Sequence, residues 1–383
     1  MWVVFAAGLG AGAYMSKVPP ALPAMRADLG LTLVESGFIH TVMYALGSAA
    51  GVFGGALADR FGQKRFALLG LGLMVLGGLV GAFSSSYQLL LASRFLEGAG
   101  FILLAVAAAP LLVAATRPHD RPSAFAIWSC YMPTGGALIL LLAPLALATF
   151  GWRSLWLGLA AYTVLCALLL ARWVPAPSFG GQIGSLALLR ESLARPGILL
   201  LCVAFICYVG QWISVMTWLP TFVVGERGAS QTTASLLTAA FVAVNIPGNL
   251  LGGLLLKRRV PRWLVMALGA AFMGITAVGL WSAVPDSLRF ACVLAFSLLG
   301  GLVPVCVFSG APVHAKSAQH VGTANGMVMQ ASHLSQFVIP IVVAWVATRM
   351  GGWSATLGVM LALSSIGVAA GLAISRYERR LQP

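Results

Sequence analysis

Three charged side chains, two basic and one acidic, interrupt the long apolar runs of this sequence. Lys17 stands in the run that begins at Trp2, and Arg94 and Glu97 stand three positions apart in another run. A charge at the centre of a membrane-spanning helix costs about 2.5–3.5 kcal/mol, so each one needs a physical reason. Spaced by three, Arg94 and Glu97 share one helix face. Either Arg94 handles an anion or a proton while Glu97 carries the proton, or the two form an internal ion pair that holds helices together.

Lys17 lies near the outer end of its apolar run and is followed by Val18, Pro19 and Pro20. If Lys17 faces a cavity, it adds a second positive charge at a depth similar to that of Arg94. Two such cations suit a small carboxylate or a comparable anion. The alternative is a lysine that extends its ammonium group to the outer membrane interface.

Amides, a histidine and aromatic residues place further polar groups inside the apolar runs. Gln330 and His333 share a helix face, and a histidine titrates near physiological pH, which suits proton coupling or a substrate hydrogen bond. A histidine that is satisfied within the core is the alternative. Asn245 precedes Pro247, so its helix either unwinds toward a ligand or only kinks. We expect Glu97 and His333 to couple protons, and we expect the substrate site to comprise Lys17, Arg94, Tyr131, Gln211, Asn245, Gln330 and His333.

The composition is that of an integral membrane protein. Hydrophobic residues make up 60% of the chain and charged residues 8%, against about 25% charged residues in globular proteins. Twelve spanning helices of about 20 residues would use roughly 240 positions and leave only short connections. We therefore predict an all-α membrane fold without a large soluble domain.

Twelve apolar runs are long enough to cross a bilayer. The longest polar interruption, at residues 175–196, separates six of them from the other six. We predict an N-terminal half at 1–174, a cytoplasmic linker at 175–196 and a C-terminal half with a short basic tail at 197–383. The predicted spans are residues 2–23, 36–57, 66–84, 88–115, 124–149, 154–174, 197–223, 232–256, 263–283, 288–313, 324–349 and 353–375.

The net charge of +14 has a topological explanation. Most of the Lys and Arg residues fall in connections that the positive-inside tendency assigns to the cytoplasm. An even number of spans then puts both termini on the cytoplasmic side of the cytoplasmic membrane. Because topology accounts for the basic excess, we do not expect a nucleic-acid partner.

Motifs for catalysis, metal binding and nucleotide binding are absent from the sequence. The six cysteines stand in apolar runs without a C-x-x-C or Cys/His ligand spacing. No G-x-x-x-x-G-K-[ST] motif occurs, which disfavours an ATP-driven pump. We expect no catalytic residues, no metal and no cofactor.

The loop between the second and third apolar runs combines glycine with strong charge. Its residues Gly55, Leu57, Asp59, Arg60, Gly62, Lys64 and Arg65 resemble the loop 2-3 signature of the major facilitator superfamily. The stretches Arg94 to Gly98 and Trp218 to Pro220 look similar to the cyanate and nitroimidazole permease branch. The resemblance implies a monomer of two six-helix halves with substrate bound between them. It also implies a cytoplasmic gate formed by Asp59, Arg60, Gly62 and Arg65, in which the Asp59 carboxylate caps a helix N-terminus of the second half.

These patterns predict a secondary active transporter. The expected substrate is a small organic anion that moves with protons by alternating access, and the expected partners are that substrate, protons and the lipid bilayer. The alternative is a proton-driven exporter of amphipathic drug-like compounds, which the Trp, Met and Phe content of the spans favours. Against it, Met132 stands before Pro133 where the antiporter pattern of the family carries glycine.

Overall fold

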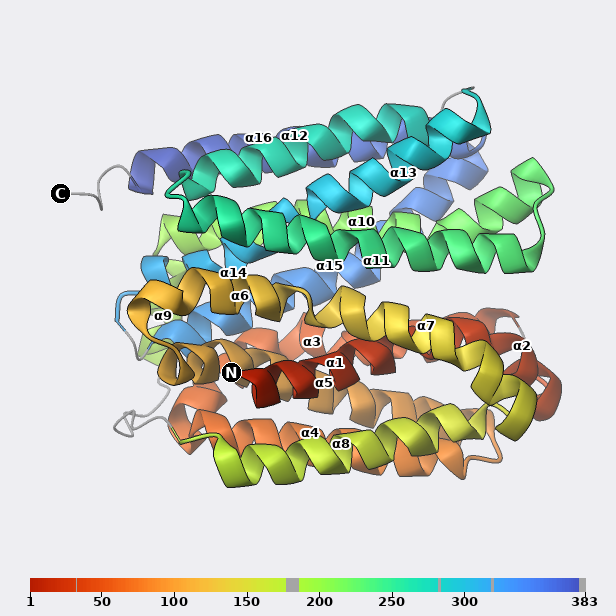
Figure 1. The fold of residues 1–383 in the computed structure, drawn as a ribbon, viewed down its shortest axis with the longest axis horizontal. Coiled ribbons are helices and arrows are strands. Elements are labelled where there is room, and N and C mark those ends of the chain that lie inside the picture. Colours follow the sequence, from red (N-terminus) through yellow and green to blue (C-terminus); the bar gives the residue numbers. More distant parts are fainter. Residues whose placement is uncertain (32, 177–185, 282–283, 318–319, 379–383) are drawn as a thin grey trace. The chain divides into compact units, whose positions relative to one another are not determined.

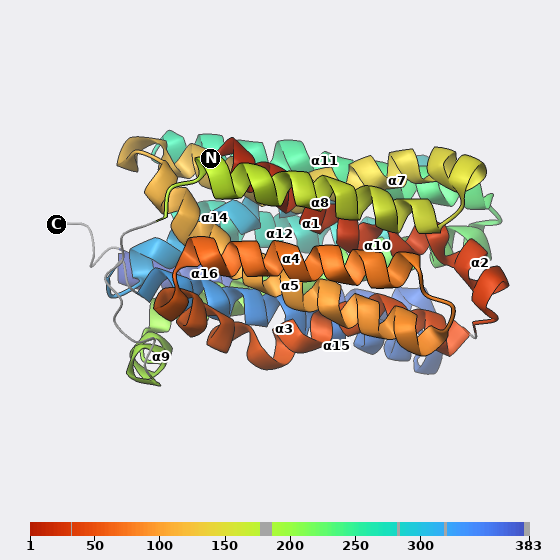
Figure 2. The same cartoon turned by 90° about the horizontal axis from the view of Figure 1, so that it is seen from below.

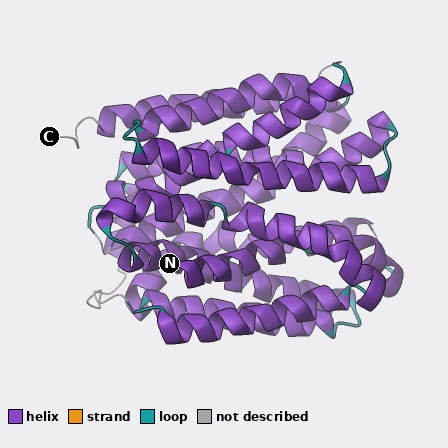
Figure 3. Ribbon diagram, viewed as in Figure 1, coloured by secondary structure: helices purple, strands orange, loops and turns teal. Residues whose placement is uncertain are grey.

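The computed structural model describes residues 1–383 except 32, 177–185, 282–283, 318–319 and 379–383. Every regular element among the described residues is a helix, as Figure 3 shows. Ten helical segments are long and apolar enough to cross a membrane, and two shorter apolar helices lie at Trp2–Ser16 and Phe38–Ala49. This is the architecture that the composition predicts.

Three predicted spans are each divided into two helices, and a proline explains each division. The predicted spans 2–23, 124–149 and 288–313 correspond to pairs of helices whose first members end at Ser16, Ser129 and Gly300. Each of these residues lies four positions before a proline, namely Pro20, Pro133 and Pro304. A proline has no N–H for the carbonyl four residues earlier, and its ring clashes with that carbonyl. A proline thus interrupts the helix within each of these three predicted spans.

The described residues form two compact units. The first comprises Met1–Arg121, Tyr131–Arg190 and Gln319–Gln330, and the second comprises Pro122–Cys130, Glu191–Ala318 and Ala331–Pro383. These units do not coincide with the predicted halves, because residues 122–130 and 319–330 group with the opposite part of the chain. Part of the predicted linker lies outside the described residues, so the division into halves at 175–196 stays a prediction.

The first unit is built on helices that pack side by side (Figure 2). Helix α4 packs against α5 and α8, α1 packs against α7 and α8, and α3 packs against α5. The unit also holds the start of α15, as far as Gln330. Its helices are α1 (Trp2–Ser16), α2 (Val18–Leu29), α3 (Leu33–Phe61), α4 (Gln63–Ala82), α5 (Tyr87–Ala115), η1 (Pro118–Asp120), α7 (Tyr131–Phe150) and α8 (Arg153–Trp173).

In the second unit, α12 packs against α13 and α16, α10 packs against α14 and α16, and α11 packs against α13 and α14 (Figure 1). Ser230 caps the N-terminus of α11 by accepting a hydrogen bond from the Thr233 backbone N–H at 3.1 Å. The helices of this part of the chain are α6 (Arg121–Ser129), α9 (Leu186–Leu193), α10 (Pro196–Arg227), α11 (Gln231–Lys257), α12 (Arg262–Trp281), α13 (Asp286–Gly300), α14 (Leu302–His314), α15 (Val321–Arg349), η3 (Trp353–Thr356) and α16 (Leu357–Glu378).

The turn between α3 and α4 depends on Gly62, whose φ is +91°. A side chain at this φ would be strained, so glycine is the residue that the turn requires. Lys64 then donates from Nζ to the Ala171 carbonyl near the end of α8 at 2.8 Å. The end of α11 makes a similar left-handed turn with a non-glycine residue, Arg259, at φ +62°.

Candidate functional site

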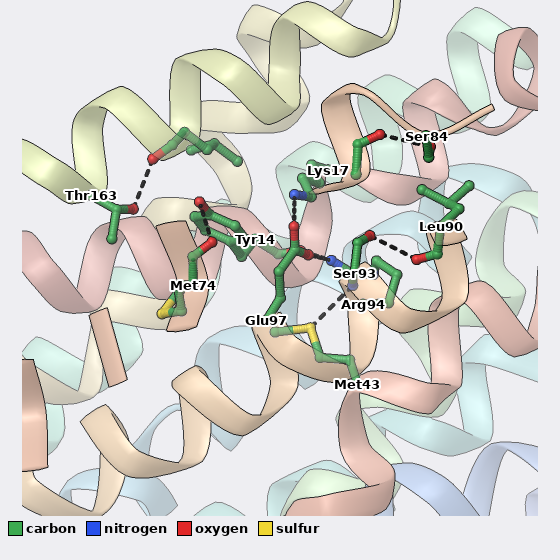
Figure 4. A network of polar contacts seen from close by, with 12 residues as sticks. Tyr14, Lys17, Met43, Met74, Ser84, Leu90, Ser93, Arg94, Glu97 and Thr163 are labelled. Carbon is green, nitrogen blue, oxygen red and sulfur yellow. Dashed lines mark hydrogen bonds and ion pairs between the residues drawn. The ribbon is translucent and has the colours of Figure 1, made fainter. Parts of the chain in front are cut away.

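The three charges that stood out in the sequence meet in one cluster of the first unit (Figure 4). Lys17 Nζ lies 2.7 Å from Glu97 Oε1, and Arg94 pairs with the other oxygen of the same carboxylate. All three side chains are fully buried. The Glu97 carboxylate therefore bridges two cations, one on each oxygen, and leaves the cluster with one net positive charge.

The Arg94 guanidinium also ties three helices together. Its NH1 donates to the Tyr14 carbonyl at 3.0 Å, and its Nε donates to the Ile39 carbonyl at 3.2 Å. Its NH2 lies 3.0 Å from Met43 Sδ. Tyr14 lies in the last turn of α1, where backbone carbonyls have no partner within the helix. Arg94 thus compensates for a helix end that the break at Lys17 creates.

Lys17 does not expose its ammonium group in this structure. It is the single residue between α1 and α2, and it is fully buried against Glu97. An extended lysine at the membrane interface would expose its ammonium group. The structure instead supports the pairing of this charge inside the first unit. The partner, Glu97, comes from a helix 80 positions away in the sequence.

Two aromatic residues of the cluster were missed by the sequence reasoning. Tyr14 of α1 and Trp156 of α8 are fully buried, and their ring centroids lie 4.2 Å and 4.1 Å from Lys17 Nζ. Aromatic residues are frequent in membrane helices, so only their contact with a buried charge distinguishes these two. The ring of His40 in α3 packs edge to face against Tyr44, with centroids 6.1 Å apart.

The predicted residues Gln211 and Asn245 take part in polar contacts of the second unit. Asn245 Nδ2 donates to the Ser297 carbonyl at 2.7 Å, and the Tyr208 hydroxyl donates to Asn245 Oδ1 at 3.3 Å. Gln211 Oε1 accepts a hydrogen bond from Ser364 Oγ at 3.0 Å. These bonds join α11 to α13 and to α10, and they join α10 to α16. The amides therefore serve the packing of this unit, and their contact with substrate stays a prediction.

The remaining substrate candidates are buried or partly buried. Tyr131 begins α7 and is buried, and His333 is buried within α15. Gln330 donates from Nε2 to the Ser48 carbonyl of α3 at 3.0 Å. The structure thus brings Lys17, Arg94 and Glu97 into direct contact, and it leaves the roles of the other candidates as predictions.

The predicted gate residues stand where α3 ends and α4 begins. Asp59 and Arg60 lie in the last turn of α3, and the positions of their side chains are outside the described residues. Gly62 forms the left-handed turn, and Arg65 is exposed in the first turn of α4. The gate assignment stays a prediction. Within the described residues, no group of three or more His, Cys, Asp and Glu side chains could hold a metal ion.

Comparison with known proteins agrees with the helical architecture. The model of the Major Facilitator Superfamily matches residues 2–340 and 200–382. The chain is also similar in fold to the crystal structure of the transporter FucP in the outward conformation. The TM-score is 0.78 at 17% identity, and the match covers 97% of each chain.

Three curated relatives align with most of the sequence. A probable sulfoacetate transporter of Cupriavidus necator is 25% identical, over 95% of this chain and 90% of the relative. The 3-(3-hydroxy-phenyl)propionate transporter of Escherichia coli is 27% identical, over 86% and 82%. The 2-nitroimidazole transporter of Escherichia coli is 24% identical, over 93% and 90%. Together with the family match across the chain, these relatives show that the protein is a multi-pass membrane transporter, not an enzyme, and that it belongs to the major facilitator superfamily.

Proposed function

We propose that this protein moves a small organic anion across the cytoplasmic membrane by alternating access, together with a proton. The observation that carries the proposal is the Glu97 carboxylate, which bridges Lys17 and Arg94 in a fully buried cluster. A carboxylate held between two cations occupies the position that the carboxylate or sulfonate of a substrate would take. Two of the relatives are described as transporters of sulfoacetate and of a phenylpropionate, which are organic anions at neutral pH.

Protonation of Glu97 supplies the coupling in this proposal. When Glu97 is ionised, it neutralises one of the two cations and competes with a substrate anion. When Glu97 is protonated, the cluster carries two positive charges without a counter-ion, which is unfavourable in a low-dielectric interior. An incoming anion relieves that cost. Anion and proton therefore bind together, and neither is favoured alone.

The test is transport by the purified protein in proteoliposomes. Labelled sulfoacetate and labelled 3-(3-hydroxyphenyl)propionate would be offered with and without an inward proton gradient, with an uncoupler as control. We expect accumulation that depends on the gradient. Lys17→Met and Arg94→Gln should abolish it, and uptake that persists in both variants would contradict the anion site.

Glu97→Gln separates coupling from binding. The variant mimics the protonated carboxyl group, so it should still exchange labelled for unlabelled anion across the membrane but fail to concentrate it with a proton gradient. His333→Gln is the matched variant for the second proton-coupling candidate. If His333→Gln, and not Glu97→Gln, uncouples transport from the gradient, then His333 carries the proton.

The same assay distinguishes the alternative function. An exporter of amphipathic compounds would move such compounds out of the liposomes in exchange for protons that enter down an inward gradient, and it would transport neither anion. That result would leave Lys17, Arg94 and Glu97 with a structural role. Transport that is unchanged in Asp59→Asn, with the fold intact, would contradict the proposed cytoplasmic gate.

The membrane orientation is also part of the proposal. The even number of predicted spans and the basic tail at residues 376–380 support two cytoplasmic termini. We also propose that the transporter acts as a monomer and binds no nucleic acid. Reporter fusions at both termini would test the orientation. Light scattering of the protein–detergent complex would test whether the protein is a monomer.

A further inference from the structure

The Lys17 ammonium group is enclosed by two aromatic rings as well as by its carboxylate partner. Its Nζ lies 4.2 Å from the ring centroid of Tyr14 and 4.1 Å from that of Trp156. Both distances are inside the range of about 6 Å over which a ring face attracts a cation. Tyr14, Lys17 and Trp156 are each 0% exposed. The ammonium group is therefore stabilised by ring faces on two sides and by Glu97.

The indole N–H of Trp156 makes no hydrogen bond within the part of the chain that the structure describes. Its Nε1 is buried and has no hydrogen-bond partner among the described residues, although a buried tryptophan usually finds one. Trp152, four positions earlier in the sequence, donates its own N–H to Asp28 Oδ2 at 3.0 Å. The Trp156 ring packs edge to face against Trp152, with centroids 5.1 Å apart, and its face lies over Lys17. Since Trp156 gains no hydrogen bond, these two ring contacts are the favourable interactions that its orientation provides.

Helix α4 has room for both rings because two of its residues lack a side chain. A Cβ at Gly78 would lie 2.8 Å from the Tyr14 hydroxyl oxygen, and a Cβ at Gly81 would overlap the Trp156 indole ring. Spaced by three, Gly78 and Gly81 share one face of α4. The Tyr14 hydroxyl also donates to the Met74 carbonyl of α4 at 3.1 Å, which fixes the ring over Lys17.

The rings matter most when Glu97 is neutral. Lys17 then has lost the carboxylate at 2.7 Å, while Arg94 still repels it. A fully buried ammonium group without a counter-ion favours loss of its proton, because burial disfavours charge. A neutral Lys17 would attract an anion much less strongly. Ring faces offset this tendency without competing for the anion, since they carry no charge.

Resting on the proposed function, we propose that Tyr14 and Trp156 form an aromatic cage that keeps Lys17 charged and in place while Glu97 is protonated. An incoming anion then meets two cations and not one. Tyr14 and Trp156 act through Lys17, so they are positioning residues for anion binding. Their rings do not cover the side of the ammonium group that faces Glu97. That side is available to the Glu97 carboxylate or to the substrate anion that replaces it.

A double-mutant cycle tests the cage without any ligand. The unfolding midpoint of purified protein would be measured for Trp156→Leu in the wild-type and in the Lys17→Met background. We expect a larger decrease when lysine is present, because only then does the substitution remove an attraction between a cation and a ring face. An equal decrease in both backgrounds overturns the cage. Trp218→Leu is the control and should cost the same in both, because the ring of Trp218 contacts Trp353 in the second unit.

Conservative variants show whether the ring face or the indole N–H matters. Trp156→Phe keeps an aromatic ring and removes only an N–H that makes no hydrogen bond. Its stability and its anion affinity should therefore be closer to those of the wild type than those of Trp156→Leu are. Trp152→Phe should instead lose stability, because the hydrogen bond to Asp28 disappears. If Trp156→Phe loses as much stability and anion affinity as Trp156→Leu, the proposal is overturned. This comparison remains valid even if Trp156→Leu folds poorly.

The pH dependence of anion binding gives a readout that a packing role would not change. The charged and titratable groups around Lys17 are Glu97 and Arg94 of α5 and Tyr14 of α1, with His40 and Tyr44 of α3 close to Arg94. Glu97→Gln removes the carboxylate itself. In that background, the thermal stabilisation by sulfoacetate and by 3-(3-hydroxyphenyl)propionate would be followed between about pH 6 and about pH 9.

Adding Trp156→Leu to Glu97→Gln should make the stabilisation by these anions disappear at a lower pH than in Glu97→Gln alone. Adding Trp218→Leu should leave the pH at which the stabilisation disappears unchanged. Identical profiles for the Trp156→Leu and Trp218→Leu proteins would overturn the proposed cage. If no anion stabilises the wild-type or the Glu97→Gln protein, the proposed function fails, and the ligand-free cycle alone decides whether the cage exists.

Discussion

Asn325 donates from Nδ2 to the Val106 carbonyl at 3.0 Å, and Val106 lies four residues before Pro110. Pro110 has no N–H, so helix α5 itself cannot supply a donor to that carbonyl. The amide of Asn325, near the start of α15, supplies it. The same Nδ2 donates to the Ala105 carbonyl at 2.9 Å. A side chain of α15 thus compensates, within the first unit, for a backbone hydrogen bond that α5 lost to its proline.

Asn325→Ala should lower the free energy of unfolding by about 1–3 kcal/mol, because it leaves a buried carbonyl without a partner. In a Pro110→Ala background, α5 regains the N–H, and the same substitution should cost much less. Thermal unfolding of the four proteins in detergent measures the difference. Gln330→Ala is the control, since its partner, the Ser48 carbonyl, lies in α3, away from any change at Pro110. Equal costs of Asn325→Ala in both backgrounds would argue against the compensation.

Gly81→Ala should destabilise the protein and weaken anion binding together. The new methyl group would overlap the Trp156 ring and lie 2.8 Å from Ser93 Oγ, so the ring must move away from Lys17. Overpacking of this kind costs typically about 1–3 kcal/mol. Gly72→Ala in the same helix is the control, because a Cβ there meets nothing within 4 Å. Unfolding midpoints and anion titrations of both variants would be compared, and similar behaviour of the two would contradict the steric argument.

Arg259→Gly should raise stability. Arg259, two residues after the last residue of α11, has φ +62°, a conformation that costs a side chain roughly 1–2 kcal/mol and costs glycine little. The greater freedom of glycine in the unfolded chain offsets part of the gain. We expect a net increase of about 0.5–1 kcal/mol in the free energy of unfolding. Arg258→Gly, at the neighbouring position with φ −79°, should instead lose stability. A lower unfolding midpoint for Arg259→Gly than for the wild type would contradict the proposed backbone strain at Arg259.

Asp28 makes stability depend on pH in the acidic range. Hydrogen bonds from Arg153, at 2.5 Å, and from Trp152, at 3.0 Å, lower the pKa of its carboxyl group below the ordinary value. The stabilisation is therefore present above the unfolded pKa of about 4, and it is lost as pH falls through the lower folded value. Because the pair is partly exposed, the effect is about 0.2–1 kcal/mol. Asp28→Asn should lower the unfolding midpoint at neutral pH, and its difference from the wild type should shrink below about pH 4. A difference that is constant with pH would exclude the carboxylate as its source.

Much of the fold follows from the sequence because a bilayer allows few solutions. A long apolar run in lipid must satisfy its own backbone, so it becomes a helix. The breaks after Ser16, Ser129 and Gly300 also follow from local chemistry, since a proline stands four residues later in each case. Pro110 and Pro247 show the limit of that rule, because both lie inside continuous helices. Whether a proline breaks a helix or only perturbs it depends on whether neighbouring side chains supply a hydrogen-bond donor to the carbonyl four residues before the proline.

The candidate site was also predictable from the sequence only in part. The cost of burying charge marked Lys17, Arg94 and Glu97 from the sequence alone, and their shared face predicted the contact between Arg94 and Glu97. Lys17 and Glu97 are 80 positions apart, and Trp156 comes from a further helix, so only the packing of α1, α5 and α8 brought them together. Local sequence determines which groups are too costly to bury alone, because that cost belongs to each residue. Which group relieves the cost is decided by the tertiary structure, because the partner is a neighbour in space and not along the chain.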